Sequence, residues 1–322
     1  MSPSLEFIER CSAQTGFQIA PLEKVIRLGE MAGDIRRHPF LGGILALKGG
    51  TALNLCFGPP QRLSVDLDFN FIGDVDREKM LEERPQLETV IIDLAQRRGY
   101  LVQRTSEAFA GGKFYLRYRS VLGQQDRIEI DINFMFRVPL AETEKKSLWQ
   151  PGGLDQPRVL VVGLEELWIG KLLALLNRCA AKDVWDTANS KGIAAEVVKS
   201  GLFRARFLAM AAVLDHPLPS YGRSRFERLL TDRIVVEQLG PMLAQGRIPS
   251  ANELIERSWT IVHPFLNLDA REEEYFKAIN RGELKAEYLF PDTPDEAAKF
   301  NGHPAILWKV ANVRKNLKRT NR

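Results

Sequence analysis

Hydrophobic and polar positions alternate most clearly in the segment "LSVDLDFNFIG", residues 63–73. One set of alternate positions is apolar, namely Val65, Leu67, Phe69 and Phe71, and the other set is polar, namely Asp66, Asp68 and Asn70. Successive side chains of a β-strand point to opposite faces, so this pattern predicts a half-buried strand. The strand has an acidic face.

A second alternating pattern predicts a β-hairpin. Two stretches, 113–120 and 126–136, are joined by the turn-forming residues "VLGQQ". In the second stretch one face carries Ile128, Ile130, Ile132 and Phe134, and the other carries Arg127, Glu129, Asp131 and Asn133. A third carboxylate, Asp131, is therefore expected to point away from the core.

Helical spacing of apolar residues governs most of the remaining chain. The segment 40–50, "FLGGILALKGG", predicts a short buried strand that ends in a turn, and Thr51 is a good residue to cap the helix that follows. Helices are expected at 3–37, at 51–57 and at 77–98. A Pro/Gly-rich break at 150–157 precedes a long helical region, so a domain boundary is expected near residue 158.

Composition narrows the class of protein only slightly. The 322 residues carry 45 basic and 41 acidic side chains, and a formal charge of +4 is too small to identify a nucleic-acid binder. The three cysteines are far apart and lack zinc-ligand spacing, which favours a reducing compartment. No basic leader and no apolar run of about 18 residues is present. We therefore expect a soluble cytoplasmic protein that does not contact a membrane.

The paired acids Asp66 and Asp68 are the first candidates for chemistry. Two carboxylates a few Å apart repel each other by about 4 kcal/mol at an effective dielectric constant near 20, so a cation is expected between them. Magnesium fits, because it binds carboxylate oxygens together with substrate phosphates. Asp131 on a neighbouring strand would complete a ligand set for a two-metal phosphoryl transfer. The alternative is a strand that merely exposes its polar face to water.

The turn Gly49-Gly50-Thr51 is the second candidate. It lies between a predicted strand and a helix start, where free backbone N–H groups favour a phosphate. Lys48 precedes the glycines, so the turn is not a Walker A loop. An ordinary strand-to-helix connection is the alternative.

Lys171 is the third candidate, because it falls in the centre of the apolar stripe formed by Leu164, Leu167, Trp168 and Leu175. A lysine there must find an anion or lose its charge. It can reach a nucleotide phosphate across the domain boundary, or its stem can pack while the amine reaches water. Asp186, near Asp183 and Lys182, can orient Lys171 or act as a base; a helix cap or a plain salt bridge is the alternative.

Two basic segments are candidates for RNA binding. Lys113, Arg117 and Arg119 alternate along one strand with Tyr115 among them, a pattern that suits phosphates and stacked bases. The alternative is an edge strand protected by charge. The last 14 residues contain six basic residues and no acid, and Arg314, Lys315 and Lys318 are the candidates there.

These pieces together resemble the AbiEii/AbiGii-type nucleotidyltransferase toxins, which include the MenT-type tRNA nucleotidyltransferase toxins, a branch of the DNA polymerase β-like superfamily. The matching segments are "LKGGTAL" (47–53), "RLSVDLDF" (62–69), "IEIDI" (128–132) and "EELWIGKLLALLNRCAAKDVWD" (165–186). The resemblance implies a polymerase β-like α/β (α+β) domain with a small mixed sheet at 1–157. A mostly helical domain at 158–322 would contribute Lys171 and Asp186 to the active-site cleft.

The resemblance also implies a role for each matching residue. Gly49 and Gly50 would form the turn that holds the triphosphate, lined by Lys48, Thr51, Arg62 and Ser64. Asp66 and Asp68 would bind Mg²⁺ or Mn²⁺, and Asp131 would be the third carboxylate of the superfamily. Lys171 and Asp186 match a lysine and an aspartate that the family requires for activity. Ser64 matches a serine that the antitoxin phosphorylates in some relatives.

The expected activity is that of a toxin that transfers a nucleoside monophosphate from a nucleoside triphosphate to the 3′ acceptor end of tRNA. Such a transfer would block aminoacylation and translation, and a cognate antitoxin would be encoded nearby. One alternative keeps the chemistry but modifies a protein or small-molecule hydroxyl. Another is a non-catalytic RNA-binding relative, which the retention of Asp66, Asp68 and Lys171 argues against.

Overall fold

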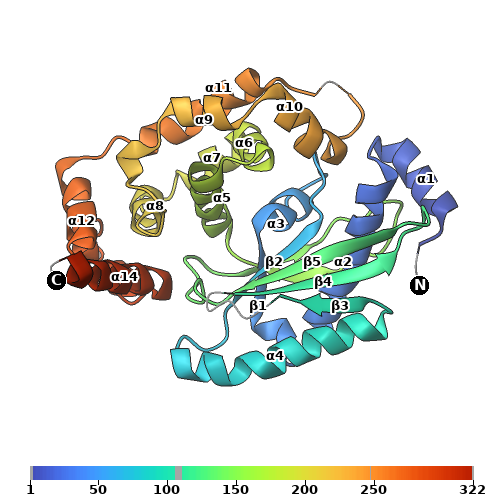
Figure 1. Ribbon diagram of the computed structural model, residues 1–322, viewed down its shortest axis with the longest axis horizontal. Coiled ribbons are helices and arrows are strands. Elements are labelled where there is room, and N and C mark those ends of the chain that lie inside the picture. The colour runs from blue at the N-terminus through green and yellow to red at the C-terminus, as the bar shows by residue number, and fades with distance from the viewer. Residues whose placement is uncertain (1–2, 106–110, 247, 321–322) are drawn as a thin grey trace. The chain divides into compact units, whose positions relative to one another are not determined.

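The computed structural model describes residues 3–105, 111–246 and 248–320, and the chain divides into two compact units (Figure 1). The first unit comprises residues 1–163 and 236–248, and the second comprises residues 164–235 and 249–322. The sequence placed the boundary after residue 157. The first unit continues to Gly163 because the strand Arg158–Val161 belongs to its sheet.

The first unit combines four α-helices with the strands of one sheet, counted over the described residues. Its helices are α1 (Leu5–Thr15), α2 (Ile19–Arg37), α3 (Gly49–Leu55) and α4 (Arg77–Arg97). Its strands are β1 (Leu45–Lys48), β2 (Asp66–Phe71), β3 (Leu101–Arg104), β4 (Gly111–Arg119), β5 (Gln125–Asn133), β6 (Glu144–Ser147) and β7 (Arg158–Val161). The expected helix at 3–37 is interrupted at Gly16, whose positive φ of 76° ends α1.

The described strands form a seven-stranded mixed sheet in the order β3-β4-β5-β2-β1-β7-β6. The pairs β2–β5 and β1–β7 are parallel, and the other neighbours are antiparallel. The predicted small mixed sheet is confirmed, although β3, β6 and β7 were not predicted. Because β4 lies between β3 and β5, the interpretation of its basic face as that of an edge strand is wrong.

Alternating burial along the strands builds the core of this unit. Ile128, Ile130 and Ile132 of β5 are fully buried, as is Leu67 of β2. Helix α2 contacts β2, β5 and β7 and packs against α4 (Figure 1). Its buried apolar residues include Leu22, Val25 and Ile26. The polar positions of β2 and β5 are left on the other side of the alternation, where Asp66, Asp68 and Asp131 lie.

A buried carboxylate fastens α2 to the turn between β4 and β5. Glu23 is 0% exposed and accepts hydrogen bonds from Arg27 Nε at 3.0 Å, Ser120 Oγ at 2.6 Å and the Val121 N–H at 3.1 Å. The Arg27 guanidinium lies 3.9 Å from the centroid of the Tyr118 ring. The Glu23 charge is therefore paired within the core.

Replacing Glu23 with glutamine is expected to destabilise the first unit by about 3–5 kcal/mol, because the buried Arg27 would lose its anion. Urea unfolding followed by circular dichroism measures this loss. The matched control is Glu9→Gln on the exposed surface of α1, which should stay within about 0.5 kcal/mol of the parent. A loss below about 1 kcal/mol for Glu23→Gln would contradict the pairing.

The returning segment 236–248 pairs with the chain just before β2. The Leu63 N–H donates to the Met242 carbonyl at 2.8 Å, and Arg62 forms an isolated antiparallel bridge with Leu243. The Gln245 N–H donates to the Gly16 carbonyl at 2.8 Å. Residues 62–63 are thus held by a segment about 180 positions later in the sequence.

The second unit contains no strand among its described residues, which confirms the predicted mostly helical C-terminal region. Its helices are α5 (Leu164–Arg178), α6 (Ala181–Ala188), α7 (Lys191–Val197), α8 (Phe203–Ala211), α9 (Arg223–Leu229), α10 (Asp232–Ile234), α11 (Ala251–Val262), α12 (Ala270–Asn280), α13 (Pro294–Asn301) and α14 (Pro304–Thr320). Helix α6 packs against α5 and α11. Across the described ranges, no helix combines the length and apolar character needed to span a membrane.

Candidate functional site

Four carboxylates lie on the polar face of β2 and β5. In the parallel register Asp66 pairs with Glu129, and Asp68 pairs with Asp131. Neighbouring strands are about 4.8 Å apart, so each pair places its two side chains next to each other on one face. All four residues are partly exposed. The neighbouring position of Asp131 agrees with the sequence prediction, whereas Glu129 was not singled out.

Lys113 of β4 completes this acidic cluster. It opposes Asp131 in the antiparallel register, and its Nζ lies 3.4 Å from Asp131 Oδ2 and 3.5 Å from Glu129 Oε2. Burial by itself lowers the pKa of Lys113, but the two carboxylates outweigh this and raise it. The amine predicted to contact RNA is thus engaged with the acids, and it balances part of their charge.

Asp68 is held against the glycine turn. An ideal Cβ built on Gly49 would lie 2.5 Å from Asp68 Oδ2, and Gly49 has a φ of +70°, so glycine is needed there both for space and for backbone conformation. No hydrogen bond or ion pair engages the Asp68 carboxylate within the described part of the chain. Its oxygens are therefore available to a ligand.

The turn itself differs in one detail from the sequence prediction. Helix α3 begins at Gly49 with Lys48 at the N-cap position, so the predicted capping by Thr51 is wrong. Thr51 is fully buried, and its hydroxyl donates to the Asp66 carbonyl, which ties α3 to β2. Lys48 opposes Asp68 in the β1–β2 register. A sequence motif alone cannot show that the hydroxyl is committed to a distant carbonyl.

Arg62 and Ser64 lie against the second glycine of the turn. A Cβ on Gly50 would lie 2.9 Å from Ser64 Oγ and 3.0 Å from Arg62 Nη2. Both residues are buried, and Arg62 Nη1 also donates to the Leu63 carbonyl at 2.8 Å. The turn, a guanidinium and a hydroxyl thus meet at one place, a donor set that suits a phosphate.

The acidic cluster fits a magnesium ion that shares its coordination with a substrate. Among the described residues, no group of three or more His, Cys, Asp or Glu side chains is arranged to hold a metal ion alone. Magnesium is usually bound by one or two protein carboxylates together with phosphate oxygens and water. Asp68 and its neighbours Asp66 and Asp131 provide hard oxygen atoms of this kind on one face.

The second unit contains a separate buried charge cluster around Lys171. Lys171 is 5% exposed, and its Nζ lies 2.7 Å from Asp186 Oδ2 and 3.1 Å from Asp183 Oδ1. The lysine therefore finds its anions within its own unit, and the alternative in which the amine reaches water is wrong. The geometry fits an orienting role for Asp186.

Asp183 also belongs to this cluster, although the sequence predicted no role for it. Its carboxylate also accepts from Arg178, Nε to Oδ2 at 2.6 Å and Nη2 to Oδ1 at 3.0 Å. Burial would raise the pKa of Asp183, but the hydrogen bonds and charges of Arg178 and Lys171 outweigh burial and lower it. The i, i+3 spacing of Asp183 and Asp186 on one helix was the available signal.

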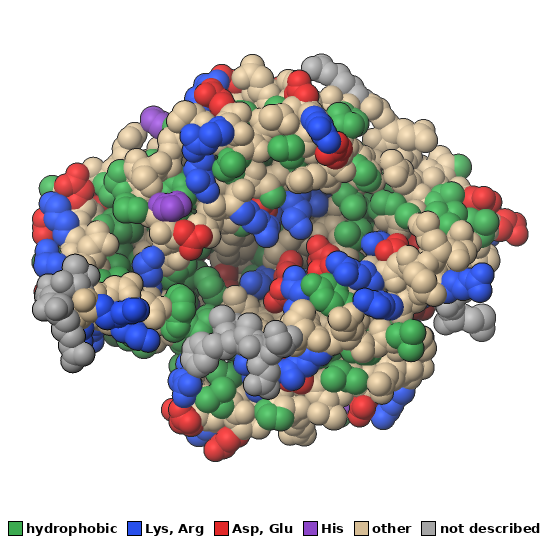
Figure 2. Space-filling model, in the orientation of Figure 1, with side chains coloured by type: hydrophobic (Ala, Val, Ile, Leu, Met, Phe, Trp, Pro, Cys, Tyr) green, Lys and Arg blue, Asp and Glu red, His purple; other side chains and the backbone are tan. Residues whose placement is uncertain are grey.

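The remaining RNA candidates are exposed. Arg117 Nη2 donates to Gln103 Oε1 at 2.7 Å, and Arg119 lies two residues further on the same face of β4. Arg314, Lys315 and Lys318 are exposed on α14, where Figure 2 shows basic side chains over the helix. Arg314 Nε donates to the Gly282 carbonyl at 2.6 Å, whereas neither Lys315 nor Lys318 makes a side-chain hydrogen bond or ion pair with the described part of the chain.

Comparison with known proteins gives the family. The model for "Nucleotidyl transferase AbiEii toxin, Type IV TA system" matches residues 34–251, more than half of the chain. The chain belongs to the AbiEii nucleotidyltransferase toxin family. An AbiEii protein is a nucleotidyltransferase, which uses a nucleoside triphosphate, and a toxin of a type IV toxin–antitoxin system, which implies an antitoxin partner.

A solved structure of a nucleotidyltransferase toxin shares the fold of this chain. MenT4, a nucleotidyltransferase toxin from Mycobacterium tuberculosis H37Rv, is 21% identical with a TM-score of 0.58 over 89% of this chain and 98% of its own. JHP933 from Helicobacter pylori is 16% identical with a TM-score of 0.41, over 82% of this chain and 98% of its own. Among curated proteins, none matches the chain. The likeness to MenT4 shows a shared mixed α/β fold and carries no residue assignments.

Proposed function

We propose that this AbiEii protein transfers a nucleoside monophosphate from a nucleoside triphosphate to the 3′ acceptor end of tRNA and thereby blocks aminoacylation and translation. The carrying observation is the register that sets Asp68 beside Asp131 and next to the Gly49 turn. This arrangement brings acids for a cation and donors for phosphates into one unit. The resemblance to tRNA-modifying relatives supports the choice of acceptor.

Each residue of the first unit has a proposed task. Asp66 and Asp68, with Asp131, would hold Mg²⁺ or Mn²⁺, which when bound neutralises the phosphates and promotes attack by the acceptor hydroxyl. The turn Gly49-Gly50 would receive the triphosphate, with Lys48, Thr51, Arg62 and Ser64 around it. The new bond joins the acceptor oxygen to the α-phosphorus, and the bond from this phosphorus to pyrophosphate breaks.

The second unit is proposed to supply Lys171 and Asp186 to the reaction. Lys171 would balance the negative charge of the leaving pyrophosphate, and Asp186, 2.7 Å away, would orient its amine. Either Asp131 or Asp186 would take the proton of the acceptor hydroxyl. Arg117, Arg119 and the basic residues of α14 would contact the RNA backbone.

The test is incubation of the purified protein with each α-labelled nucleoside triphosphate, Mg²⁺ and total RNA. A labelled band of tRNA size is expected. EDTA in the reaction mixture should prevent the labelling, and an excess of Mg²⁺ or Mn²⁺ should restore it. Label on protein or on a small molecule would instead favour a different acceptor. No incorporation from any nucleotide would exclude the proposed activity.

Replacing Gly49 with alanine tests the turn. The left-handed φ of +70° and the 2.5 Å approach to Asp68 Oδ2 both resist a Cβ, so we expect a loss of stability of about 1–3 kcal/mol and displacement of the Asp68 carboxylate. Nucleotide transfer should fall at least 10-fold. The control is Gly99→Ala, which has a φ of +82° but nothing within 4 Å of the new Cβ. It should lose stability without losing transfer.

A further inference from the structure

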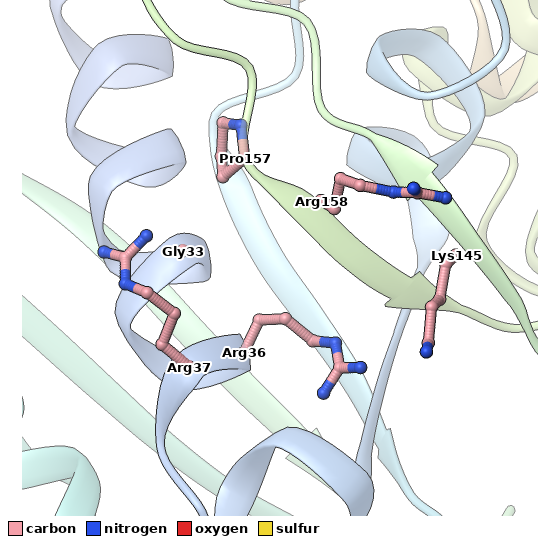
Figure 3. Close-up of a pocket in the computed structure, with 6 residues that line it drawn as sticks. All are labelled: Gly33, Arg36, Arg37, Lys145, Pro157 and Arg158. Atoms are coloured by element: carbon pink, nitrogen blue, oxygen red, sulfur yellow. The ribbon is translucent and has the colours of Figure 1, made fainter.

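A basic pocket lies in the first unit. It shares no lining residue with the acidic cluster. Figure 3 shows it between the last turn of α2 and two strands, the edge strand β6 and its neighbour β7. The pocket has a volume of about 470 Å³ and is lined by Gly33, Arg36, Arg37, Lys145, Pro157 and Arg158. Four of these six residues are cationic, and none is acidic.

Two of the four cations have no protein partner. Lys145 and Arg158 are exposed, and within the described residues neither makes an ion pair or a side-chain hydrogen bond. Arg36 Nη1 donates to the Gly42 carbonyl at 2.7 Å, which fixes its guanidinium without neutralising it. Arg37 alone has an anion, Asp34 Oδ1 at 2.6 Å, and Asp34 is shared with Arg98. The pocket therefore keeps a net positive charge.

The backbone allows the cations to gather. A Cβ on Gly33 would lie 3.2 Å from Pro157 Cβ and 3.2 Å from Arg37 Nη1, so the small residue leaves room for Pro157, which precedes β7, and for the Arg37 side chain. In Figure 3 the Arg36 side chain extends from α2 toward the strands that carry Lys145 and Arg158. Helix, turn and strands thus bring together cations that are more than 100 residues apart in sequence.

The like charges around the pocket repel each other, and an anion bound in the pocket would attract each of them and so compensate this repulsion. Guanidinium groups match phosphate oxygens in shape, and lysine adds a point charge. The lining offers no aromatic ring and no side-chain hydrogen-bond acceptor. The pocket can therefore recognise phosphate charge but not the identity of a base.

We propose that this pocket binds phosphates of the RNA backbone at a distance from the reacting 3′ end. The inference rests on the proposed function, because it assumes an RNA acceptor. Arg158 lies three residues before Val161, which corresponds to about 10 Å along β7. Val161 pairs with Leu47 of β1. A polynucleotide is long enough to occupy both the pocket and the acidic face, whereas a mononucleotide is not.

The test uses the full-length double variant Lys145→Glu/Arg158→Glu. Since both side chains are exposed and unpaired, folding should be preserved, and circular dichroism checks this. With labelled tRNA as the probe, the dissociation constant at about 0.1 M salt should rise on the order of 10-fold. The logarithm of the association constant falls linearly with the logarithm of the salt concentration, and the magnitude of this slope should decrease by about 1.5 to 2, as expected for two lost phosphate contacts. The KM for tRNA should rise while kcat at saturating tRNA and the KM for the nucleotide stay unchanged.

The matched control reverses two other exposed and unpaired arginines of the same unit, Arg10→Glu/Arg97→Glu. It makes the same change of net charge and should shift the tRNA affinity less than 3-fold. Equal losses of tRNA affinity in both double variants would overturn the proposal, because the change of net charge would explain them. An unchanged KM for tRNA, or a raised KM for the nucleotide, would overturn it while leaving the proposed function intact. If the parent protein transfers nucleotides only to protein, the proposed function fails and the pocket proposal fails with it.

Discussion

Replacing Asp68 with asparagine is expected to lower nucleotide transfer by about 10³-fold while the protein remains folded. The loss corresponds to about 4 kcal/mol of transition-state stabilisation, as expected when a cation loses a charged ligand. Asp68 has no ion pair within the described chain, so its neutralisation leaves no cation unpaired and relieves repulsion from Asp131. Initial rates with labelled nucleoside triphosphate, together with thermal unfolding, measure both parts of the prediction.

The matched control is Glu129→Gln. Glu129 shares the acidic face and pairs with Asp66 in the register, but no metal role is proposed for it. Its transfer rate should stay within about 3-fold of the parent. A mild effect of Asp68→Asn would support the alternative of a merely solvated polar face. A Glu129→Gln effect as large as that of Asp68→Asn would mean that the ligand set was chosen wrongly.

Replacing Lys171 with methionine is expected to abolish transfer and also to destabilise the second unit by about 3–5 kcal/mol. The destabilisation follows because Asp183 and Asp186, both buried, would lose the cation between them. Loss of activity in this variant alone is therefore ambiguous between a structural and a reactive role of the lysine.

The double variant Lys171→Met/Asp186→Asn separates a purely structural role of this charge pair from a reactive role of the pair. It removes one charge of each sign, and Asp183 keeps its pair of hydrogen bonds from Arg178. Most of the lost stability should return, as judged by the unfolding midpoint, but transfer should stay at least 10²-fold below the parent. Recovery of activity in parallel with stability would show that Lys171 only neutralises buried aspartates.

The elements found from the sequence are those with enough residues to show a period. Strand β2 and the β4–β5 hairpin alternate over six or nine residues, and α4 occupies Arg77–Arg97 where a helix at 77–98 was predicted. The missed strands β3, β6 and β7 have four residues each, too few for alternation to stand out. Strand β7 also pairs with β1 more than 100 residues earlier, a contact that local pattern cannot reveal.

The side chains that lie next to the acids of the first unit depend on the register between β4 and β5. The sequence predicted that residues 121–125, whose midpoint is Gly123, join the two strands, and it assigned no register. The observed pairing of Arg119 with Gln125 centres the turn on Leu122. A centre at Gly123 pairs Lys113 with Asn133, and the observed centre pairs it with Asp131. The acids themselves were found because alternation fixes the face of a strand. The position of Lys113 between Glu129 and Asp131 was not predicted, because alternation does not show which residues of two neighbouring strands are paired.

The pairing of the returning segment 236–248 with residues 62–63 has a consequence for dissection of the protein. No single cut yields both units intact. A fragment ending at residue 163 keeps Asp66, Asp68 and Asp131 but lacks the Met242 carbonyl and Leu243, which pair with the chain at Arg62 and Leu63. Such a fragment should carry a loosened Arg62–Ser64 stretch. Its inactivity would therefore not prove that the helical unit takes part in the reaction.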